Sequence, residues 1–132
     1  MPTLRHAISF ASNDIEIVDF EIPASVRMLE LGNNQIKKVG QSLFKNGKNL
    51  DQLYLHSNIL TADGIPSMRR LRKLLRLTLG DNQMTRIPRL PRSVERVNLR
   101  DNKFEGVLPR KSLSSLRHLQ ELILIRVQIA NK

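Results

Sequence analysis

The side chains that could perform chemistry are few and scattered along the chain. The three histidines, His6, His56 and His118, lack the spacing of a helical metal-binding pair, and there is no cysteine. Asp51, His56 and Ser57 lie close together and could suggest a nucleophilic triad. On an extended segment, however, successive side chains point to opposite faces, and nothing nearby supplies an oxyanion hole. The six glycines are isolated, so no glycine-rich phosphate loop is present. The sequence therefore predicts no catalytic residue, no metal site and no cofactor.

A repeated template is far more informative than any single side chain. It reads apolar, two variable, apolar, one variable, apolar, two variable, Asn, one variable, apolar, and this is the pattern of leucine-rich repeats. Copies begin near positions 5, 26, 50, 74, 94 and 119, with Arg5 in the first apolar slot and Val127 in place of the last Asn. The two apolar residues around a single variable one lie on a short strand and both point inward.

Stacked copies of this template predict an α/β repeat fold, a leucine-rich-repeat solenoid. We expect a curved parallel sheet with one short strand per repeat and a convex side that is mostly extended, irregular or short-helical. A single repeat has too little apolar surface to fold alone, so 1–132 is predicted to be one domain of about six repeats. The template asparagines can satisfy backbone groups where the chain leaves each strand. They form a predicted Asn ladder of Asn13, Asn34, Asn58, Asn82 and Asn102.

The repeat lengths alternate, at 21, 24, 24, 20 and 25 residues from one start to the next. The two short repeats end in Ile22-Pro23 and Leu90-Pro91, and proline there favours an extended back. In the long repeats Phe44 and Met68 correspond and should fill the convex side of the core. Leu71 follows Met68 by three residues, whereas Gly47 takes the matching place after Phe44, which predicts a looser convex turn there.

This short-long-long rhythm resembles that of the small leucine-rich proteoglycans of the extracellular matrix. The Ile-Pro and Leu-Pro junctions and the segments 53–58 and 60–66 contribute to the resemblance. The closest likeness is to the branch that includes extracellular matrix protein 2, podocan and opticin. The resemblance implies an extracellular matrix protein that binds collagen or glycosaminoglycan and has no catalytic activity.

The chain differs from that family in lacking the cysteine-bearing caps, glycosylation sequons and a Ser-Gly attachment site. We interpret it as an uncapped internal stretch of a longer array or a product cut from one; the alternative is an intact small protein with a degenerate last repeat. Ile123 and Ile125 fall at outward positions of the last strand. An apolar strand edge of this kind favours self-association.

Charge divides the chain into two unlike halves. Residues 1–64 hold 6 basic and 7 acidic side chains, whereas 65–132 hold 16 basic and 5 acidic ones. This asymmetry favours a polyanionic partner such as heparan sulfate or another glycosaminoglycan. Four arginines of this half, Arg86, Arg89, Arg92 and Arg110, are spread along the chain. The densest cluster, predicted to lie on the convex edge, is Arg69, Arg70, Arg72 and Lys73.

The concave face of a solenoid is its usual binding surface. Aligning the variable strand positions places an aromatic and basic group of residues on this face. Tyrosine and arginine are enriched among interface anchors. The resulting concave strip, predicted to bind a matrix protein such as collagen, consists of Tyr54, His56, Arg76, Arg96 and Arg100.

The sequence thus favours a non-enzymatic matrix-binding module. The rival interpretation is an intracellular leucine-rich-repeat adaptor for protein–protein interaction, favoured by the absence of cysteine and of a leader sequence. Nucleic acid is a third partner class, because charge alone does not distinguish polyanions. The lack of aromatic residues near the basic cluster argues against specific single-strand binding. No stretch is long and apolar enough to span a membrane.

Overall fold

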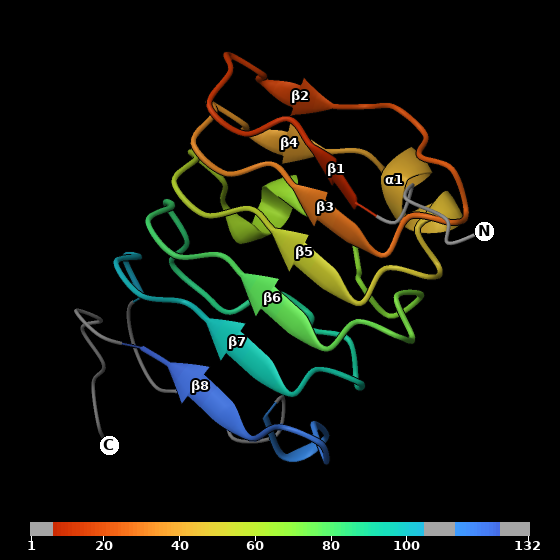
Figure 1. Ribbon diagram of the computed structural model, residues 1–132. Coiled ribbons are helices and arrows are strands. Elements are labelled where there is room, and N and C mark those ends of the chain that lie inside the picture. Colours follow the sequence, from red (N-terminus) through yellow and green to blue (C-terminus); the bar gives the residue numbers. More distant parts are fainter. Residues whose placement is uncertain (1–6, 105–112, 125–132) are drawn as a thin grey trace.

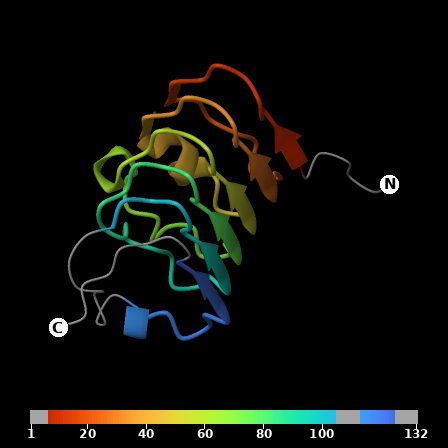
Figure 2. The same cartoon turned by 90° about the vertical axis from the view of Figure 1, so that its left-hand side faces the viewer.

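The computed structural model describes residues 7–104 and 113–124, which form a curved stack of turns (Figures 1 and 2). Every strand of the main sheet runs parallel to its neighbours, as the repeat template predicts. The sheet has six strands in the order β1-β3-β5-β6-β7-β8. They are β1 (Ala7–Ser9), β3 (Met28–Glu30), β5 (Gln52–Tyr54), β6 (Arg76–Thr78), β7 (Arg96–Asn98) and β8 (Glu121–Ile123).

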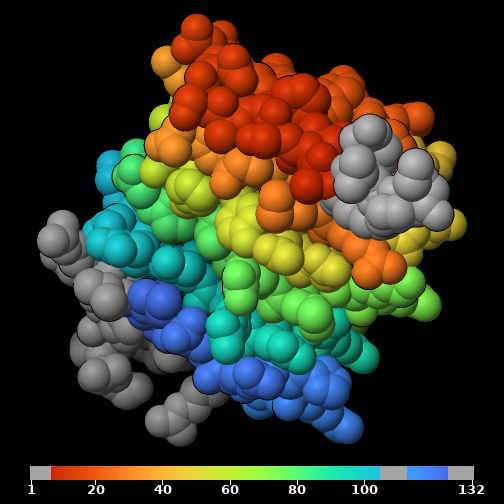
Figure 3. Space-filling view, in the orientation of Figure 1, coloured from red at the N-terminus to blue at the C-terminus, as the bar shows by residue number. Residues whose placement is uncertain are grey.

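The strand register follows the template position by position. The residue at the centre of each strand pairs with the centre of the next, as Leu29 does with Leu53 and Leu77 with Val97. These four side chains are fully or almost fully buried. The residues on either side of them point outward and cover the face of the sheet. In Figure 3 the successive turns form successive coloured bands across this face. The sheet curves gently and this face is concave (Figure 2).

The convex side contains short elements of several kinds. Two-residue strands β2 (Ile17–Val18) and β4 (Lys38–Val39) pair in parallel, and then come the helix α1 (Gln41–Asn46) and the 3-10 turn η1 (Ala62–Gly64). Strand β2 confirms that the back of the first short repeat is extended. Among the described residues, no helix is long and apolar enough to cross a membrane.

Phe44 and Met68 fill the convex side of the core, and Leu71 is buried with them. The prediction of a looser turn at Gly47 is wrong. Helix α1 ends there in a close turn, in which the Gly47 N–H donates to the Leu43 carbonyl over 2.9 Å. A Cβ atom on Gly47 would lie 2.8 Å from that oxygen and 2.9 Å from Leu50 Cδ1. Glycine is therefore needed because the chain packs tightly at this point.

The template asparagines form a ladder of hydrogen bonds between turns. Asn34, Asn58, Asn82 and Asn102 are buried, and each donates from Nδ2 to carbonyls of its own turn and of the preceding one. Each Oδ1 accepts backbone N–H groups of the preceding turn. Asn13 differs because its side chain is exposed and its Nδ2 donates to the carbonyls of Phe10 and Ala11, both in its own turn.

A left-handed residue comes directly before every one of these asparagines. Small polar side chains tolerate this conformation better than branched or bulky ones. The φ angles lie between 54° and 60°, and the residues are Ser12, Asn33, Ser57, Asp81 and Asp101. The reversal after each strand therefore has the same backbone shape in five successive turns.

The predictions for the last repeat concern residues at the limit of the structure. Ile123 is half-buried in β8. Ile125 and Val127 lie outside the described residues.

Candidate functional site

The concave strip of Tyr54, His56, Arg76, Arg96 and Arg100 lies on strands β5, β6 and β7 and directly after two of them. The Tyr54 and His56 rings meet edge to face with their centroids 6.3 Å apart. The Tyr54 hydroxyl donates to Gln52 Oε1 over 2.5 Å, and His56 Nδ1 lies 2.9 Å from Thr78 Oγ1. These contacts hold both rings in fixed positions over β5 and β6.

Two glycines give the larger side chains of this face their space. A Cβ atom at Gly32 would lie 2.5 Å from His56 Nε2, and one at Gly80 would lie 2.8 Å from Arg100 Cγ. His56 and Arg100 therefore lie over the backbone of the preceding turn. At this position of successive turns a glycine alternates with a large side chain, in the order Gly32, His56, Gly80 and Arg100, so the concave face is uneven.

The arginines of the concave strip have unlike surroundings. Arg76 and Arg96 are exposed and directly paired in register across β6 and β7, and Arg96 is paired on its other side with Glu121. Arg100 donates from Nε to Asp101 over 3.1 Å, so its charge is partly compensated. Arg76 and Arg96 are consequently the cations of this face that are most available to an anionic group.

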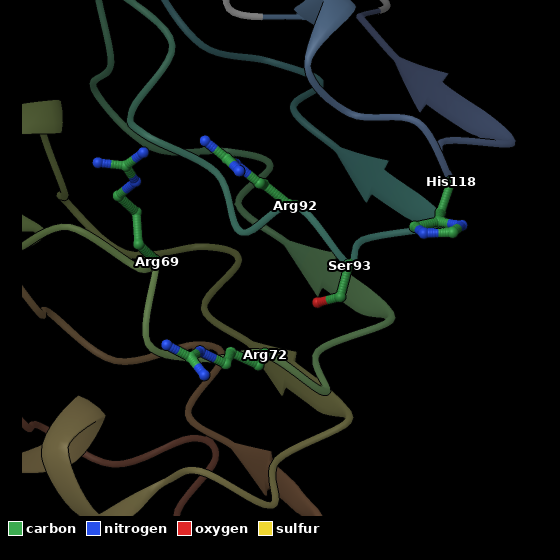
Figure 4. A pocket seen from close by; sticks show the side chains of 5 residues that line it. All are labelled: Arg69, Arg72, Arg92, Ser93 and His118. Carbon is green, nitrogen blue, oxygen red and sulfur yellow. The ribbon is translucent and has the colours of Figure 1, made fainter.

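A basic groove lies away from the concave strip, at the edge of the sheet where the chain enters the strands (Figure 4). Its volume is about 550 Å³. Arg69 and Arg72 come from the turn before β6, and Arg92 comes from the turn before β7. The described residues that line the groove are Arg69, Arg72, Arg92, Ser93 and His118.

The structure divides the basic cluster predicted from sequence. Arg69 and Arg72 enter the basic groove, whereas Arg70 lines a separate hollow of about 310 Å³ together with Arg69 and Lys45. Lys73 donates instead to Asn49 Oδ1 in the preceding turn, over 3.0 Å. As predicted, Met68 and Leu71 point into the core and leave the four cationic side chains exposed.

The sequence analysis missed three residues of this groove, Arg92, Ser93 and His118. Arg92 was counted among the scattered arginines, yet it lies beside Arg69 and Arg72. Ser93 Oγ donates to the carbonyls of Leu74 and Leu71, over 2.6 and 3.2 Å, and fixes the groove floor to the preceding turn. Continuing the alignment of the repeats backwards from the strands would have revealed Arg72 and Arg92 as neighbours.

The side chains that suggested a triad do not meet as one. His56 Nδ1 contacts Thr78, and Ser57 has a φ of 56° in the reversal after β5. In the described part of the chain, no three His, Cys, Asp or Glu side chains gather in a way that could hold a metal ion.

Comparisons with known proteins agree with this architecture. A family model described as leucine rich repeat matches residues 24–84. Podocan-like protein 1 of Homo sapiens is 32% identical over 131 residues, which are 97% of this chain and 25% of that protein. Podocan of Mus musculus is 32% identical over 125 residues, 92% of this chain and 20% of the relative. Keratocan of Mus musculus is 36% identical over 101 residues, 74% of this chain and 28% of the relative.

Two solved structures have the same fold at low sequence identity. The leucine-rich repeat domain of a Shigella effector gives a TM-score of 0.76 at 21% identity and covers 96% of this chain and 52% of its own. An internalin, inlF, of Listeria monocytogenes gives a TM-score of 0.69 at 20% identity and covers 96% of this chain and 43% of its own.

The parallel solenoid, its Asn ladder and the matching family model define this chain as a leucine-rich repeat protein. It resembles the small leucine-rich proteoglycans in sequence, and podocan, podocan-like protein 1 and keratocan are relatives of that kind. The chain spans about a quarter of the length of these curated relatives.

Proposed function

We propose that this chain is a non-enzymatic binding module of the extracellular matrix. Its basic groove binds sulfated glycosaminoglycan, and its concave strip binds a matrix protein such as collagen. The likeness to the proteoglycan relatives supports the matrix setting. The groove itself supports the choice of an anionic ligand, and the two surfaces lie on different flanks of the same turns.

The observation that most favours glycosaminoglycan is that three arginines line one groove and none of them has an ion pair among the described residues. No Asp or Glu is among the described residues that line the groove. The ion pairs in the described part of the chain use Lys37, Arg86 and Arg100 and leave Arg69, Arg72 and Arg92 out. Their planar forks match the geometry of sulfate oxygens and bind them through charge-assisted hydrogen bonds.

The test compares two triple variants of equal net charge. The groove variant is Arg69→Ser/Arg72→Ser/Arg92→Ser. The control is Arg27→Ser/Lys38→Ser/Lys103→Ser, in which all three side chains are exposed and lie outside the groove. We expect the groove variant to lose about tenfold or more of its heparin affinity, because three contacts of about 0.5–1 kcal/mol each are removed. The control should lose much less heparin affinity than the groove variant.

Isothermal titration at several salt concentrations provides the measurement. Affinity should fall steeply with salt in the wild type and less steeply in the groove variant, since fewer counterions are displaced. A third variant with Lys at all three positions keeps the charge and removes the fork, and should bind between the two extremes. Equal losses in the groove variant and the control would mean diffuse attraction and would refute the groove as a site.

The concave strip is tested separately with fibrillar collagen. Tyr54→Ala removes the aromatic anchor on β5, between β3 and β6, and Ile17→Ala removes an exposed apolar side chain from the convex strand β2 as a control. Collagen binding should weaken with Tyr54→Ala by a factor of about ten or more, as for a central interface residue, and remain with Ile17→Ala. If the groove variant abolished collagen binding as well, the two surfaces would not be independent.

A further inference from the structure

We infer that the anionic ligand is a linear sulfated polysaccharide that lies along the solenoid axis and crosses four successive turns. This inference rests on the proposed function and specifies the ligand of the same flank. The residues concerned form what we call the basic ladder: Lys48, Arg72, Arg92 and Arg117.

The basic ladder arises because one backbone turn is repeated before five strands of the main sheet, β3 and β5 to β8. In each case the fourth residue donates its N–H to the carbonyl of the first residue, three positions earlier. The turns are 23–26, 47–50, 71–74, 91–94 and 116–119, with N···O distances of 3.0–3.4 Å. The second position of this turn is Ala24 in the first copy and a cation in the next four.

Strand pairing places these four cations side by side. Each lies four residues before the first residue of its strand, and those first residues, Gln52, Arg76, Arg96 and Glu121, are paired in register. Neighbouring strands are about 4.8 Å apart, so the ladder extends about 14 Å along the axis. The adjacent column provides direct support, because Lys73 reaches Asn49 across one step.

Like charges at such a spacing disfavour one another unless an opposite charge lies between them. All four side chains are exposed, and none takes part in an ion pair within the described residues. A compact anion could contact one or two steps of this ladder. An extended chain with regularly placed sulfates can contact all four, which makes it the ligand that fits the arrangement.

Nucleic acid fits this surface less well. The described residues that line the basic groove include no Phe, Tyr or Trp, so His118 is the one ring among them on which a base could stack. The longest helix among the described residues is α1, the six residues Gln41–Asn46, which is too short to serve as a recognition helix in a DNA groove. We therefore assign the ladder to a polysaccharide and leave duplex DNA as a competitor in the test.

The experiment measures the affinity of size-fractionated heparin fragments by isothermal titration. Two fragments are used, one too short to reach from Lys48 to Arg117 and one longer than the ladder. The variants are Lys48→Ser and Arg117→Ser at the ends, Arg72→Ser within the ladder, and Lys103→Ser as an exposed control of equal charge. Inorganic sulfate and a DNA duplex of matching charge are titrated in parallel.

We expect each end variant to weaken the long fragment about two- to tenfold and to change the short one less than about twofold. Arg72→Ser should weaken both fragments, and Lys103→Ser neither. A longer fragment offers more overlapping binding positions, which raises its apparent affinity for the wild type and the end variants by the same factor. Comparing the wild type with the end variants on each fragment therefore excludes this statistical effect of fragment length. Inorganic sulfate should bind far more weakly than either fragment.

Three results would overturn the inference. In the first, the end variants weaken short and long fragments alike; in the second, inorganic sulfate competes as well as the long fragment. In the third, duplex DNA binds more tightly than the long fragment and is equally sensitive to the end variants. In the first two results the groove can still bind glycosaminoglycan, so the proposed function survives. In the third the groove prefers nucleic acid, and the proposed function fails with the inference. If no fragment binds, both ideas fail together.

Discussion

Asn58→Ala tests whether the Asn ladder stabilises the stack of turns. Asn58 is only 6% exposed and donates from Nδ2 to the carbonyls of Leu31 and Leu55, each over 3.1 Å. Its Oδ1 accepts the backbone N–H of Ile36 over 2.9 Å. The substitution removes these bonds and leaves the backbone in place.

The loss of unfolding free energy depends on which backbone groups are left without a hydrogen-bond partner. The Leu31 carbonyl still accepts a bond from Asn34, and the Leu55 carbonyl still accepts one from Asn82. The N–H of the fully buried Ile36 has no other partner among the described residues. One orphaned buried donor costs about 1–3 kcal/mol of unfolding free energy. With an m-value of about 2 kcal/mol/M, the urea midpoint should fall by about 0.5–1.5 M.

Asn13→Ala is the matched control, because it makes the same substitution at the same template position. Asn13 is exposed, and one of its two acceptors, the Phe10 carbonyl, also receives a bond from Asn34. Its cost should stay below about 1 kcal/mol, the range of an exposed hydrogen bond. Urea unfolding followed by circular dichroism measures both variants. The reasoning fails if Asn58→Ala leaves the midpoint unchanged or if the two variants cost the same.

For three further substitutions, the packing around the residue predicts the change in unfolding free energy. Gly32→Ala pushes against the movable ends of the His56 and Glu30 side chains, so it should cost less than about 1 kcal/mol in urea unfolding while weakening collagen binding. Gly64→Ala would place a Cβ 2.3 Å from the backbone oxygen of Lys37, so it should cost about 1–3 kcal/mol in the same assay. Met68→Ala should cost about 2–5 kcal/mol and leave a cavity, because this side chain is fully buried; equal stability of Met68→Ala and wild type would contradict the assigned core.

The sequence predicted the strand side of the fold in detail because two constraints agree there. Apolar residues must alternate with outward ones along each strand, and the asparagine must follow at a fixed distance. The pairing of Leu53 with Leu77 and the bond from Ile36 to Asn58 both follow from that template. A slip of one residue would turn Leu53 out of the core, so the register is strongly specified.

The convex side was less predictable because its segments vary in length and have no common template. Gly47 suggested a loose turn, although the same absence of a side chain allows helix α1 to end against Leu50. Ser57 lies directly before a template asparagine, where the chain needs a left-handed residue, and Asn33 and Asp81 fill the same position in other turns. This backbone role explains the serine, so the suggested triad failed. The small polar residues that recur at this position could already be seen in the sequence.

Sequence distance also concealed which cations are neighbours. Arg69, Arg70, Arg72 and Lys73 look like one cluster, yet the solenoid sends Lys73 to Asn49 and joins Arg72 to Arg92, which is 20 residues further along. In a repeat fold, the relevant neighbour of a residue is its counterpart in the next turn. Because the turns before β3 and β5 to β8 are hydrogen-bonded in the same way, that counterpart can be found by counting back from the strand. A charge pattern that seems diffuse along the chain can thus be a straight row on the surface, and a linear polyanion would bind to the row and not to the cluster.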